Sequence, residues 1–399
     1  MKTLELKKDF WWTGVQDPDI RMADIIVETK YGTTYNAFLL KGSEKTALFE
    51  TSKAKFMDEF MDKLTSLTDP KDIDYIIVTH TEPDHSGSVE KLLELNPEIT
   101  LVGSAMAMRF MKEVTNMDFK SITVKDGDTL SLGDKTLRFI TAVNLHWPDT
   151  IFTYIEEDKT LVTCDAFGAH YSIDSVLQST IRDNDEYIAA AKYYFDCIIG
   201  PFKPYVRQAI EKIKDLDIDM IATGHGAVLD SDPQQIIDLY AEWAQPEKPN
   251  EKPTVVIPYV SAYGYTETLA GKIAEGLNSE GVEARLFDMQ TEDQAAVLAE
   301  MRRADGILFG SPTILGEALK PIWDLLISVF PGEMKGKHAS AFGAYGWSGE
   351  AVPNLMARIR QLRMKPFEEG LRVLFKPSQA QEADAVEFGK RFAQDVKNS

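Results

Sequence analysis

Four side chains that bind metals crowd into one short stretch of this sequence. The stretch "YIIVTHTEPDHSG" begins as an apolar strand and continues with His80, Glu82, Asp84 and His85. Only six histidines occur in the chain, and two of them stand here. If both carboxylates were buried without a cation, they would lose their hydration at a large cost in free energy. The stretch therefore predicts a metal site.

Three further strands predicted in the first half also end in a residue that can bind a metal. The segment "LRFITAVNL" leads to His146, "TLVTC" to Asp165 and "MIATG" to His225. Taken singly, each histidine is better explained by a structural or capping role. Together they indicate a site, because active sites in sheet proteins gather at the edge where loops leave the strands. Seven candidate ligands suffice for two metal ions. We expect one ion at His80, Glu82 and His146, the other at Asp84, His85 and His225, and Asp165 between them.

The spacing His80-x-Glu82-x-Asp84-His85 resembles the metallo-β-lactamase fold, whose hydrolases have a histidine at the second position. Here that position is Glu82. A carboxylate in place of an imidazole makes the ligand set harder and more anionic, which favours iron or manganese over zinc. Two histidines and one carboxylate per metal, with open positions, suit redox iron that binds a small molecule.

The second half alternates strands and helices more regularly than the first. Apolar strand patterns such as "TVVIPYV" and "GILFGS" are separated by amphipathic helix patterns such as "TLAGKIAEGLNSE". A proline-rich, charged segment from Ala241 to Thr254 reads as an interdomain linker. We therefore expect two domains, residues 1–250 and residues 251–399. The alternation in the second domain predicts a doubly wound, five-stranded parallel sheet. For the first domain, the resemblance to the metallo-β-lactamase fold implies an αββα sandwich.

Three loops at strand ends of the second half contain small and hydroxyl-bearing residues. The first loop, taken alone, is also consistent with an ordinary strand–helix turn. No GxGxxG or GxxxxGK occurs, which favours a monophosphate over a dinucleotide or a nucleoside triphosphate. Tyr345 and Trp347 offer flat faces for stacking. The loops together resemble those of flavodoxin, which implies FMN as the cofactor. The candidate residues are Ser261, Ala262, Tyr263, Gly264, Tyr265, Thr266, Ser311, Pro312, Thr313, Ile314, Ala344, Tyr345, Gly346, Trp347, Ser348 and Gly349.

The motifs "HTEPDHSG", "LHWPDT", "CDAFGAH" and "GHG" together resemble the flavodiiron proteins, also called A-type flavoproteins. This resemblance implies a non-haem di-iron centre with Asp165 as the bridging carboxylate. In some members the position of His85 is not bonded to iron. The implied activity is reduction of dioxygen to water, of nitric oxide to nitrous oxide, or of both. The resemblance also implies a head-to-tail homodimer or a dimer of dimers, and an electron donor such as rubredoxin or a reduced deazaflavin. No CxxC pair follows the last predicted helix, so we expect the donor to be a separate protein or cofactor.

His170, five residues after Asp165, is a candidate for a supporting or proton-donating role, with a structural role as the alternative. Tyr194 in "AKYYFD" is a second candidate, although aromatic clusters on helices more often belong to the core. His338 is expected at the surface. The rival interpretations are a zinc-dependent hydrolase with a fused flavodoxin-like module, and a non-enzymatic electron carrier with a degenerate metal site.

Composition narrows the class of protein further. The chain has 399 residues and a net charge of −20, which argues against nucleic acids and anionic membrane surfaces as partners. No apolar run reaches membrane-spanning length, so no membrane association is expected. Two cysteines cannot build a disulfide framework, and a reducing cytoplasm is the expected location.

Overall fold

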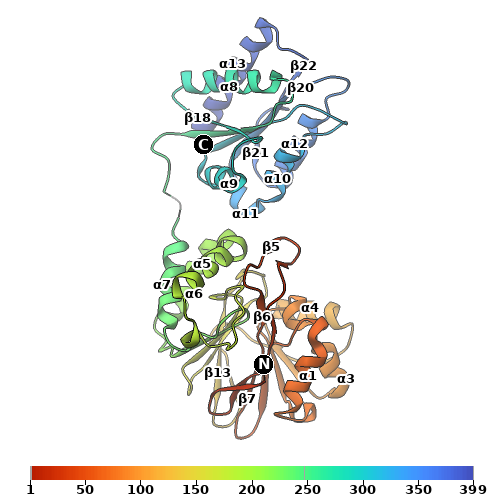
Figure 1. Ribbon diagram of the computed structural model, residues 1–399, viewed down its shortest axis with the longest axis vertical. Coiled ribbons are helices and arrows are strands. Elements are labelled where there is room, and N and C mark those ends of the chain that lie inside the picture. The colour runs from red at the N-terminus through yellow and green to blue at the C-terminus, as the bar shows by residue number, and fades with distance from the viewer. Residues whose placement is uncertain (1, 247, 399) are drawn as a thin grey trace. The chain divides into compact units, whose positions relative to one another are not determined.

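The computed structural model describes residues 2–246 and 248–398 of the chain (Figure 1). The chain divides into two compact units, Met1–Gln245 and Pro246–Ser399, a division five residues before the boundary expected from the sequence. Helix α7 extends to Trp243, so the first three residues of the expected linker are helical instead. No helix among the described residues is both long and apolar enough to cross a bilayer.

A seven-stranded sheet forms one half of the first unit. Strand β9 pairs in parallel with both β8 and β10. Its apolar residues Ile76, Ile77 and Val78 are buried, as expected for a parallel strand covered on both faces. The sheet order is β1 (Leu4–Lys7), β2 (Phe10–Trp12), β7 (Phe38–Lys41), β8 (Thr46–Phe49), β9 (Tyr75–Val78), β10 (Thr100–Gly103) and β11 (Lys120–Thr123).

A five-stranded sheet forms the other half of this unit. Strands β15 and β16 are parallel, whereas β12 to β15 pair antiparallel. Two small hairpin-like pairs, β3 (Val15–Asp17) with β6 (Thr33–Tyr35) and β4 (Met22–Ala23) with β5 (Val27–Glu28), lie outside both sheets. The sheet order is β12 (Thr129–Ser131), β13 (Thr136–Thr141), β14 (Ile151–Ile155), β15 (Thr160–Cys164) and β16 (Met220–Thr223).

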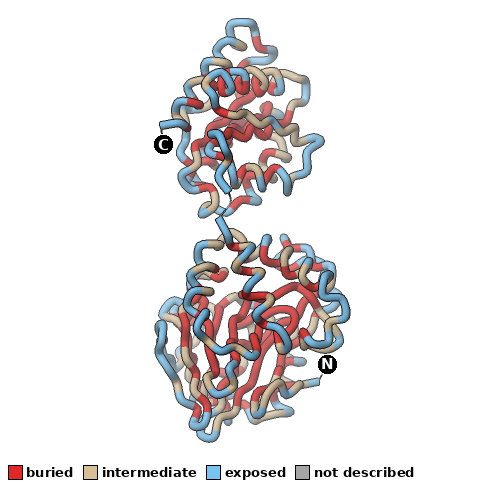
Figure 2. The backbone as a smooth tube through the Cα atoms, turned by 90° about the vertical axis from the view of Figure 1, so that its left-hand side faces the viewer, coloured by how far each residue is buried: buried red, intermediate tan, exposed pale blue. Residues whose placement is uncertain are grey.

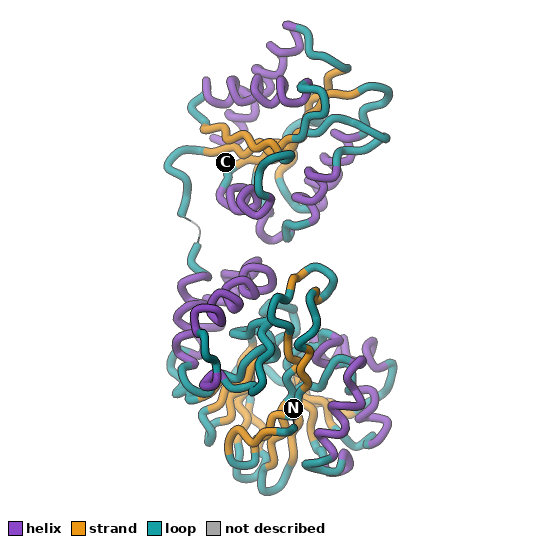
Figure 3. The backbone as a smooth tube through the Cα atoms, viewed as in Figure 1, coloured by secondary structure: helices purple, strands orange, loops and turns teal. Residues whose placement is uncertain are grey.

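The two sheets pack face to face and helices cover their outer faces. Trp12 and Phe49 of the first sheet share one core with Phe139 and Val162 of the second. Figure 2 shows this buried interior, and Figure 3 shows the helices outside it. The αββα sandwich expected from the sequence is confirmed. The helices are α1 (Met57–Thr65), α3 (Val89–Leu95) and α4 (Ala105–Thr115) on one side, and α5 (Asn184–Tyr194), α6 (Lys203–Ile213) and α7 (Pro233–Trp243) on the other.

The second unit is a doubly wound parallel sheet. Its order is β18 (Glu283–Asp288), β17 (Thr254–Tyr259), β19 (Gly306–Gly310) and β20 (His338–Tyr345), followed by β21 (Lys365–Pro366) and β22 (Leu371–Leu374). Both β21 and β22 pair in parallel with β20. The expected five-strand arrangement is therefore confirmed, with its fifth strand in two pieces.

Helices cover both faces of this sheet. The apolar sides of α8 and α13 share a core with one face, and those of α9, α10 and α12 share a core with the other. This is the layering of a doubly wound fold, in which ligands bind at the carboxyl ends of the strands. The helices are α8 (Tyr265–Ser279), α9 (Gln294–Arg303), α10 (Lys320–Ile327), α11 (Pro331–Met334), α12 (Ala351–Gln361) and α13 (Gln379–Lys397).

Candidate metal centre and flavin site

Strand ends of both sheets of the first unit deliver the seven predicted metal ligands to one place. His80 follows β9, and the short helix α2 (Pro83–Ser86) carries Asp84 and His85. From the second sheet, Asp165 follows β15 and His225 follows β16. The remaining ligand candidates are His146, in the loop between β13 and β14, and Glu82, immediately before α2.

The two oxygens of Asp165 face two different pairs of histidines. Its Oδ2 atom lies 3.4 Å from Nε2 of His80 and 3.1 Å from Nε2 of His146. Its Oδ1 atom lies 3.0 Å from Nε2 of His85 and 3.4 Å from Nε2 of His225. A carboxylate placed in this way can ligate two cations at once.

One further carboxylate completes each pair of histidines. Oε2 of Glu82 lies 3.1 Å from Nε2 of His80 and 3.2 Å from Nε2 of His146. The carboxylate oxygens of Asp84 lie 3.5 Å from Nε2 of His85 and 3.3 Å from Nε2 of His225. The structure thus brings together all seven predicted residues, and it groups them in the two sets expected from the sequence.

The second unit contains a cleft at the carboxyl ends of its strands. The cleft holds about 400 Å³ of space open to solvent. Eleven of the sixteen predicted flavin residues line it, and so does Phe375, which the sequence did not single out. The lining residues are Ser261, Ala262, Tyr263, Tyr265, Thr266, Pro312, Thr313, Ile314, Ala344, Tyr345, Gly346 and Phe375.

The first flavin loop is shaped by the beginning of helix α8. Gly264 precedes the helix with a φ of +80°, a left-handed conformation that favours glycine. The Oγ atom of Ser261 accepts a hydrogen bond of 3.2 Å from the backbone N–H of Glu267. Thr266 ties this loop to the third one, because its Oγ1 accepts a bond of 3.3 Å from the N–H of Ala344. The helix N-terminus therefore lies at the cleft, where it favours a phosphate group.

Comparisons with known proteins agree with both halves of this description. Residues 33–226 match the family described as ODP family beta lactamase, and residues 257–389 match the flavodoxin family. The chain is 38% identical to a flavo-diiron protein of Clostridium acetobutylicum, over 99% of this chain and 100% of that protein. It is also 38% identical to a type A flavoprotein of Rhodobacter capsulatus, over 96% of this chain and 89% of that protein. The chain belongs to the flavodiiron proteins.

Solved structures of flavodiiron proteins have the same fold. The rubredoxin oxygen:oxidoreductase of Desulfovibrio gigas superposes with a TM-score of 0.71 at 28% identity, covering 100% of this chain and 99% of that one. The flavodiiron protein of Giardia intestinalis superposes with a TM-score of 0.68 at 27% identity, covering 100% and 97%. As a flavodiiron protein, the chain is an oxidoreductase that uses FMN and a non-haem di-iron centre.

The metal cluster of this flavodiiron protein fits two irons. Several of its polar atoms are buried and have no hydrogen-bond partner among the described residues, as expected where cations complete the site. The donor set of four imidazoles and three carboxylates is harder than the nitrogen-rich and sulfur-rich sets of zinc sites. The buried atoms without a partner are Nδ1 of His80, Oδ1 of Asp84, both ring nitrogens of His85 and Oδ2 of Asp165.

Charges in the metal-free cluster are strongly coupled. Burial opposes a charge on His80, but the neighbouring carboxylates of Asp149 and Glu82 raise its pKa to about 10. Burial opposes a charge on His146 too, and the neighbouring carboxylates of Asp165 and Glu82 raise its pKa to about 9. Burial would raise the pKa of Glu82, yet the two imidazoles lower it to about 2. Metal binding must therefore displace protons from this cluster.

Supporting residues around the ligands were not identified from the sequence. Asp149 faces His80 at 3.6 Å and accepts a hydrogen bond of 2.9 Å from the N–H of Thr81. The Nδ1 atom of His225 lies 2.6 Å from the carbonyl oxygen of Thr34. Such partners fix the orientation of metal-binding imidazoles. Asp149 has a sequence signal, since it stands three residues after His146 in "LHWPD", whereas Thr34 contributes only its backbone.

His170 and Tyr194, the two predicted catalytic residues, lie on the His225 side of the cluster. The ring of His170 lies 5.2 Å from that of His225 and 4.9 Å from that of Tyr194. Nδ1 of His170 lies 2.8 Å from Oγ1 of Thr33. Burial and the neighbouring His225 lower the pKa of His170 to about 3, so its ring is neutral near pH 7. Burial raises the pKa of Tyr194 well above its ordinary value, so its hydroxyl keeps its proton.

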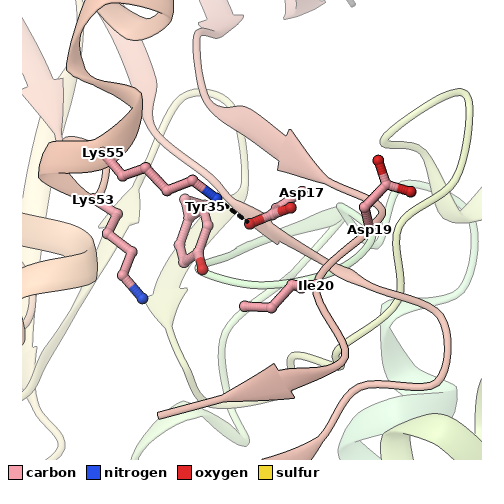
Figure 4. Close-up of a pocket in the computed structure, with 6 residues that line it drawn as sticks. All are labelled: Asp17, Asp19, Ile20, Tyr35, Lys53 and Lys55. Atoms are coloured by element: carbon pink, nitrogen blue, oxygen red, sulfur yellow. Dashed lines mark ion pairs between the residues drawn. The ribbon is translucent and has the colours of Figure 1, made fainter. Parts of the chain in front are cut away.

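A separate pocket, with about 430 Å³ of space open to solvent, lies beside the metal cluster (Figure 4). The ring of Tyr35 lines this pocket and lies 5.7 Å from the ring of His225, edge on. Lys55 and Asp17 pair across the pocket at 3.6 Å. Tyr35 therefore separates the pocket from the His225 side of the metal cluster.

Five predicted flavin residues do not line the cleft itself. Ser311 is buried and structural, because its Oγ accepts a hydrogen bond of 2.9 Å from the N–H of Leu319. Trp347 is 98% exposed. The other three are Gly264 in the first loop and Ser348 and Gly349 in the third; both glycines have a positive φ.

The prediction that His338 lies at the surface was wrong. The residue begins strand β20, its side chain is buried, and Nδ1 lies 2.5 Å from a carboxylate oxygen of Asp395 in α13. Because β20 is an apolar, buried strand, it carries His338 into the interior. There the carboxylate of Asp395 pairs with the imidazole ring.

Proposed function

We propose that this flavodiiron protein reduces dioxygen to water, nitric oxide to nitrous oxide, or both, at a di-iron centre supplied with electrons by FMN. The observation that carries the proposal is that two sets of two histidines and one carboxylate lie on either side of Asp165. In one of these sets, Glu82 occupies the position that is histidine in the zinc hydrolases. The name of the Desulfovibrio gigas relative, an oxygen oxidoreductase, supports dioxygen as one substrate.

We propose that the seven residues each ligate iron in the grouping that the structure shows. When bound, the irons supply open coordination positions and two electrons, and FMN supplies up to two more. Glu82, Asp84 and Asp165 offset the cationic charge of the metals. Two residues beside the cluster hold protons close to the reacting gas. Tyr194 retains its O–H proton, and the neutral ring of His170 is oriented by Thr33.

Dissolved substrate reaches the centre most directly at His146 and Glu82, the most exposed of the candidate ligands. Their side chains are 21% and 20% exposed, whereas those of His80 and His85 are fully buried. The ring of Phe202 lies 6.5 Å from that of His146 and forms an apolar wall on this side. A small apolar gas passes such a wall more easily than an anion.

The test of this function is anaerobic reduction followed by turnover with each gas. The preparation must first show two irons and one FMN per chain. We expect the reduced protein to consume dioxygen, nitric oxide or both over many turnovers. Failure with both gases, in protein that holds both cofactors, would falsify the proposal. Two zinc ions with hydrolase activity would instead favour the rival hydrolase.

We further propose a separate electron donor, such as rubredoxin or a reduced deazaflavin, and a cytoplasmic location. The sequence has two cysteines, Cys164 and Cys197, and neither is in a disulfide; two thiols cannot form the four-cysteine iron site of a rubredoxin. The relative from Desulfovibrio gigas is named as a rubredoxin oxidoreductase, which supports that donor. Stopped-flow reduction of the FMN by each candidate donor distinguishes them.

We also propose a head-to-tail homodimer or a dimer of dimers, in which FMN of one subunit serves the irons of another. The test mixes two variants that are inactive alone. Asp165→Ala should lose iron but keep FMN, and Ala344→Arg should fill the flavin cleft but keep iron. Subunit exchange should restore part of the activity, because one mixed pair is complete. A mixture that exchanges subunits yet stays inactive contradicts this arrangement.

A further inference from the structure

Three buried residues that could bind a cation meet on one side of the di-iron cluster, and the proposed reaction does not use all of them. Glu50 follows strand β8, Cys164 ends strand β15, and His85 lies in helix α2. One ligand atom from each residue lies within 4.8 Å of the other two. Glu50 and Cys164 were not predicted as site residues from the sequence.

The side chains of this group are buried and incompletely satisfied. Glu50 is 3% exposed, and Cys164 and His85 are each 1% exposed. Oε1 of Glu50 accepts a hydrogen bond of 2.7 Å from the N–H of Thr79, which leaves the other carboxylate oxygen available to a cation. Cys164 is in no disulfide, and its thiol donates only a long bond of 3.9 Å to Oδ1 of Asp165. The Nδ1 atom of His85 is buried and has no hydrogen-bond partner among the described residues.

His85 can serve this group without leaving the di-iron cluster. Its Nε2 atom faces Oδ1 of Asp165 at 3.0 Å, and the second ring nitrogen can bind another cation once that cation displaces its proton to solvent. The thiol of Cys164 lies 3.9 Å from the same oxygen of Asp165, so the sulfur is next to the cluster but is not among its seven ligands.

We propose that Glu50, His85 and Cys164 form a third metal site, which takes a divalent cation of the zinc type. Thiolate, imidazole and carboxylate are the three ligand classes that zinc binds. Ligand atoms at about 2.0–2.3 Å from a tetrahedral zinc ion lie roughly 3.3–3.8 Å apart. The three ligand atoms lie within 4.8 Å of one another, so side-chain movements of about 1 to 1.5 Å at most bring them to that spacing.

The backbone around this site is held firmly, which keeps the three groups together. The N–H and the Oγ1 of Thr51 both donate to the carbonyl oxygen of His85, each at 2.7 Å. The N–H of Gly224 donates to the carbonyl oxygen of Cys164. A Cβ atom added at Gly224 would lie 2.9 Å from Cε1 of His85, so the glycine lets His85 and Cys164 approach. This site goes beyond the proposed gas reduction and does not depend on it.

The test adds Zn²⁺ to protein already loaded with iron and FMN, because filled iron positions cannot take the zinc. We expect one zinc to be retained per chain after dialysis, with the iron still bound. Zinc-edge X-ray absorption should show one sulfur neighbour at about 2.3 Å. Cys164→Ser should remove that sulfur neighbour. The exposed cysteine provides a matched control, since Cys197→Ser should leave it unchanged.

A second variant covers the case in which Cys164→Ser fails to fold. Glu50→Gln keeps an oxygen that can accept from Thr79 but removes the charge, and it should weaken zinc binding roughly 10- to 100-fold. No zinc retained by the iron-loaded protein, or zinc with only nitrogen and oxygen neighbours, overturns the third site. Neither result affects the proposed gas reduction, which the iron and turnover measurements test separately.

Discussion

Asp165 is the residue on which both halves of the metal cluster depend. Each of its oxygens faces one pair of histidines, at distances of 3.0 to 3.4 Å. We therefore predict that Asp165→Ala loses both irons rather than one, and keeps FMN because the flavin cleft belongs to the other unit. Iron and flavin per chain are the quantities to measure.

A matched control for this variant is Asp196→Ala. Asp196 is exposed and pairs with Lys192 on the surface, so its loss should change neither cofactor. Retention of a full iron complement in Asp165→Ala would show that this carboxylate is not a shared ligand.

The coupled charges predict how the stability of the metal-free protein depends on pH. The pKa of His80 is raised from 6.5 to about 10, so its contribution is complete below pH 6.5 and is lost as the pH rises through 10. The pKa of Glu82 is lowered from 4.5 to about 2, so its contribution is complete above pH 4.5 and is lost as the pH falls through 2. Between pH 4.5 and pH 6.5, protein stripped of metal by a chelator should therefore keep both contributions to its free energy of unfolding in full.

Urea unfolding of the metal-free protein across this pH range measures the effect. We expect the free energy of unfolding to fall above pH 6.5 and below pH 4.5. In Glu82→Gln, the fall below pH 4.5 should be smaller. A free energy that rises steadily from pH 6.5 to pH 10 would contradict the raised pKa of His80.

Among single residues, the sequence revealed the seven candidate ligands better than the residues that support them. His80, Glu82, Asp84 and His85 are adjacent in the chain, and a carboxylate or imidazole at a strand end is visible in the sequence. Glu50 is separated from His85 by 35 positions, and its approach depends on the pairing of β8 with β9. Contacts of this kind are set by sheet register, which the sequence does not display.

Among the elements, the end of strand β16 shows how closely the backbone approaches the metal cluster. A Cβ atom at Gly224 would lie 2.9 Å from both Cε1 of His85 and the carbonyl carbon of Cys164. Gly224→Ala should therefore displace His85, reduce iron content and destabilise the first unit by about 1–3 kcal/mol. Iron per chain and chemical unfolding test this expectation.

The control for the glycine change is Gly271→Ala in helix α8. Nothing lies within 4 Å of a Cβ atom there, and alanine favours a helix over glycine by up to about 1 kcal/mol. We expect unchanged iron and flavin contents and equal or higher stability. If both variants keep iron equally well, close packing at Gly224 does not position His85.

The elements that periodicity defines well were predicted, and the irregular ones were not. Buried parallel strands such as β9 and β19 read as apolar runs, and the main helices follow their 3.6-residue pattern. The fifth strand of the second sheet is broken between β21 and β22, where Gly370 has a φ of +83°. This break precedes Phe375, and the aromatic side of the cleft was missed because "RVLFKPS" looks like an ordinary strand end.

For the whole molecule, the two compact units should unfold as separate transitions. FMN binds the second unit, so adding it at 100 times its dissociation constant should stabilise that transition by about 2.7 kcal/mol and leave the other unchanged. Iron should act only on the first transition. Calorimetry of the apoprotein with each cofactor tests this, and one transition that responds to both would show that the units are not independent.

The two-unit organisation itself was readable from the change in composition near Ala241, because proline and charge replace periodic apolar residues there. The place of the division depends on where packing stops, and helix α7 continues to Trp243 because Ile236, Ile237 and Tyr240 are buried in the core of the first unit.

The order of the candidate ligands along the chain also determines which site is synthesised first during translation. His225, the last of the seven, precedes the end of the first unit at Gln245, and 154 residues from Pro246 to Ser399 follow. At about 5–20 residues per second, a ribosome needs roughly 8 to 30 s to add them. During that interval all seven proposed iron ligands have been synthesised while the flavin cleft is still incomplete. The proposed iron ligands are thus complete in a nascent chain before the residues of the flavin cleft are.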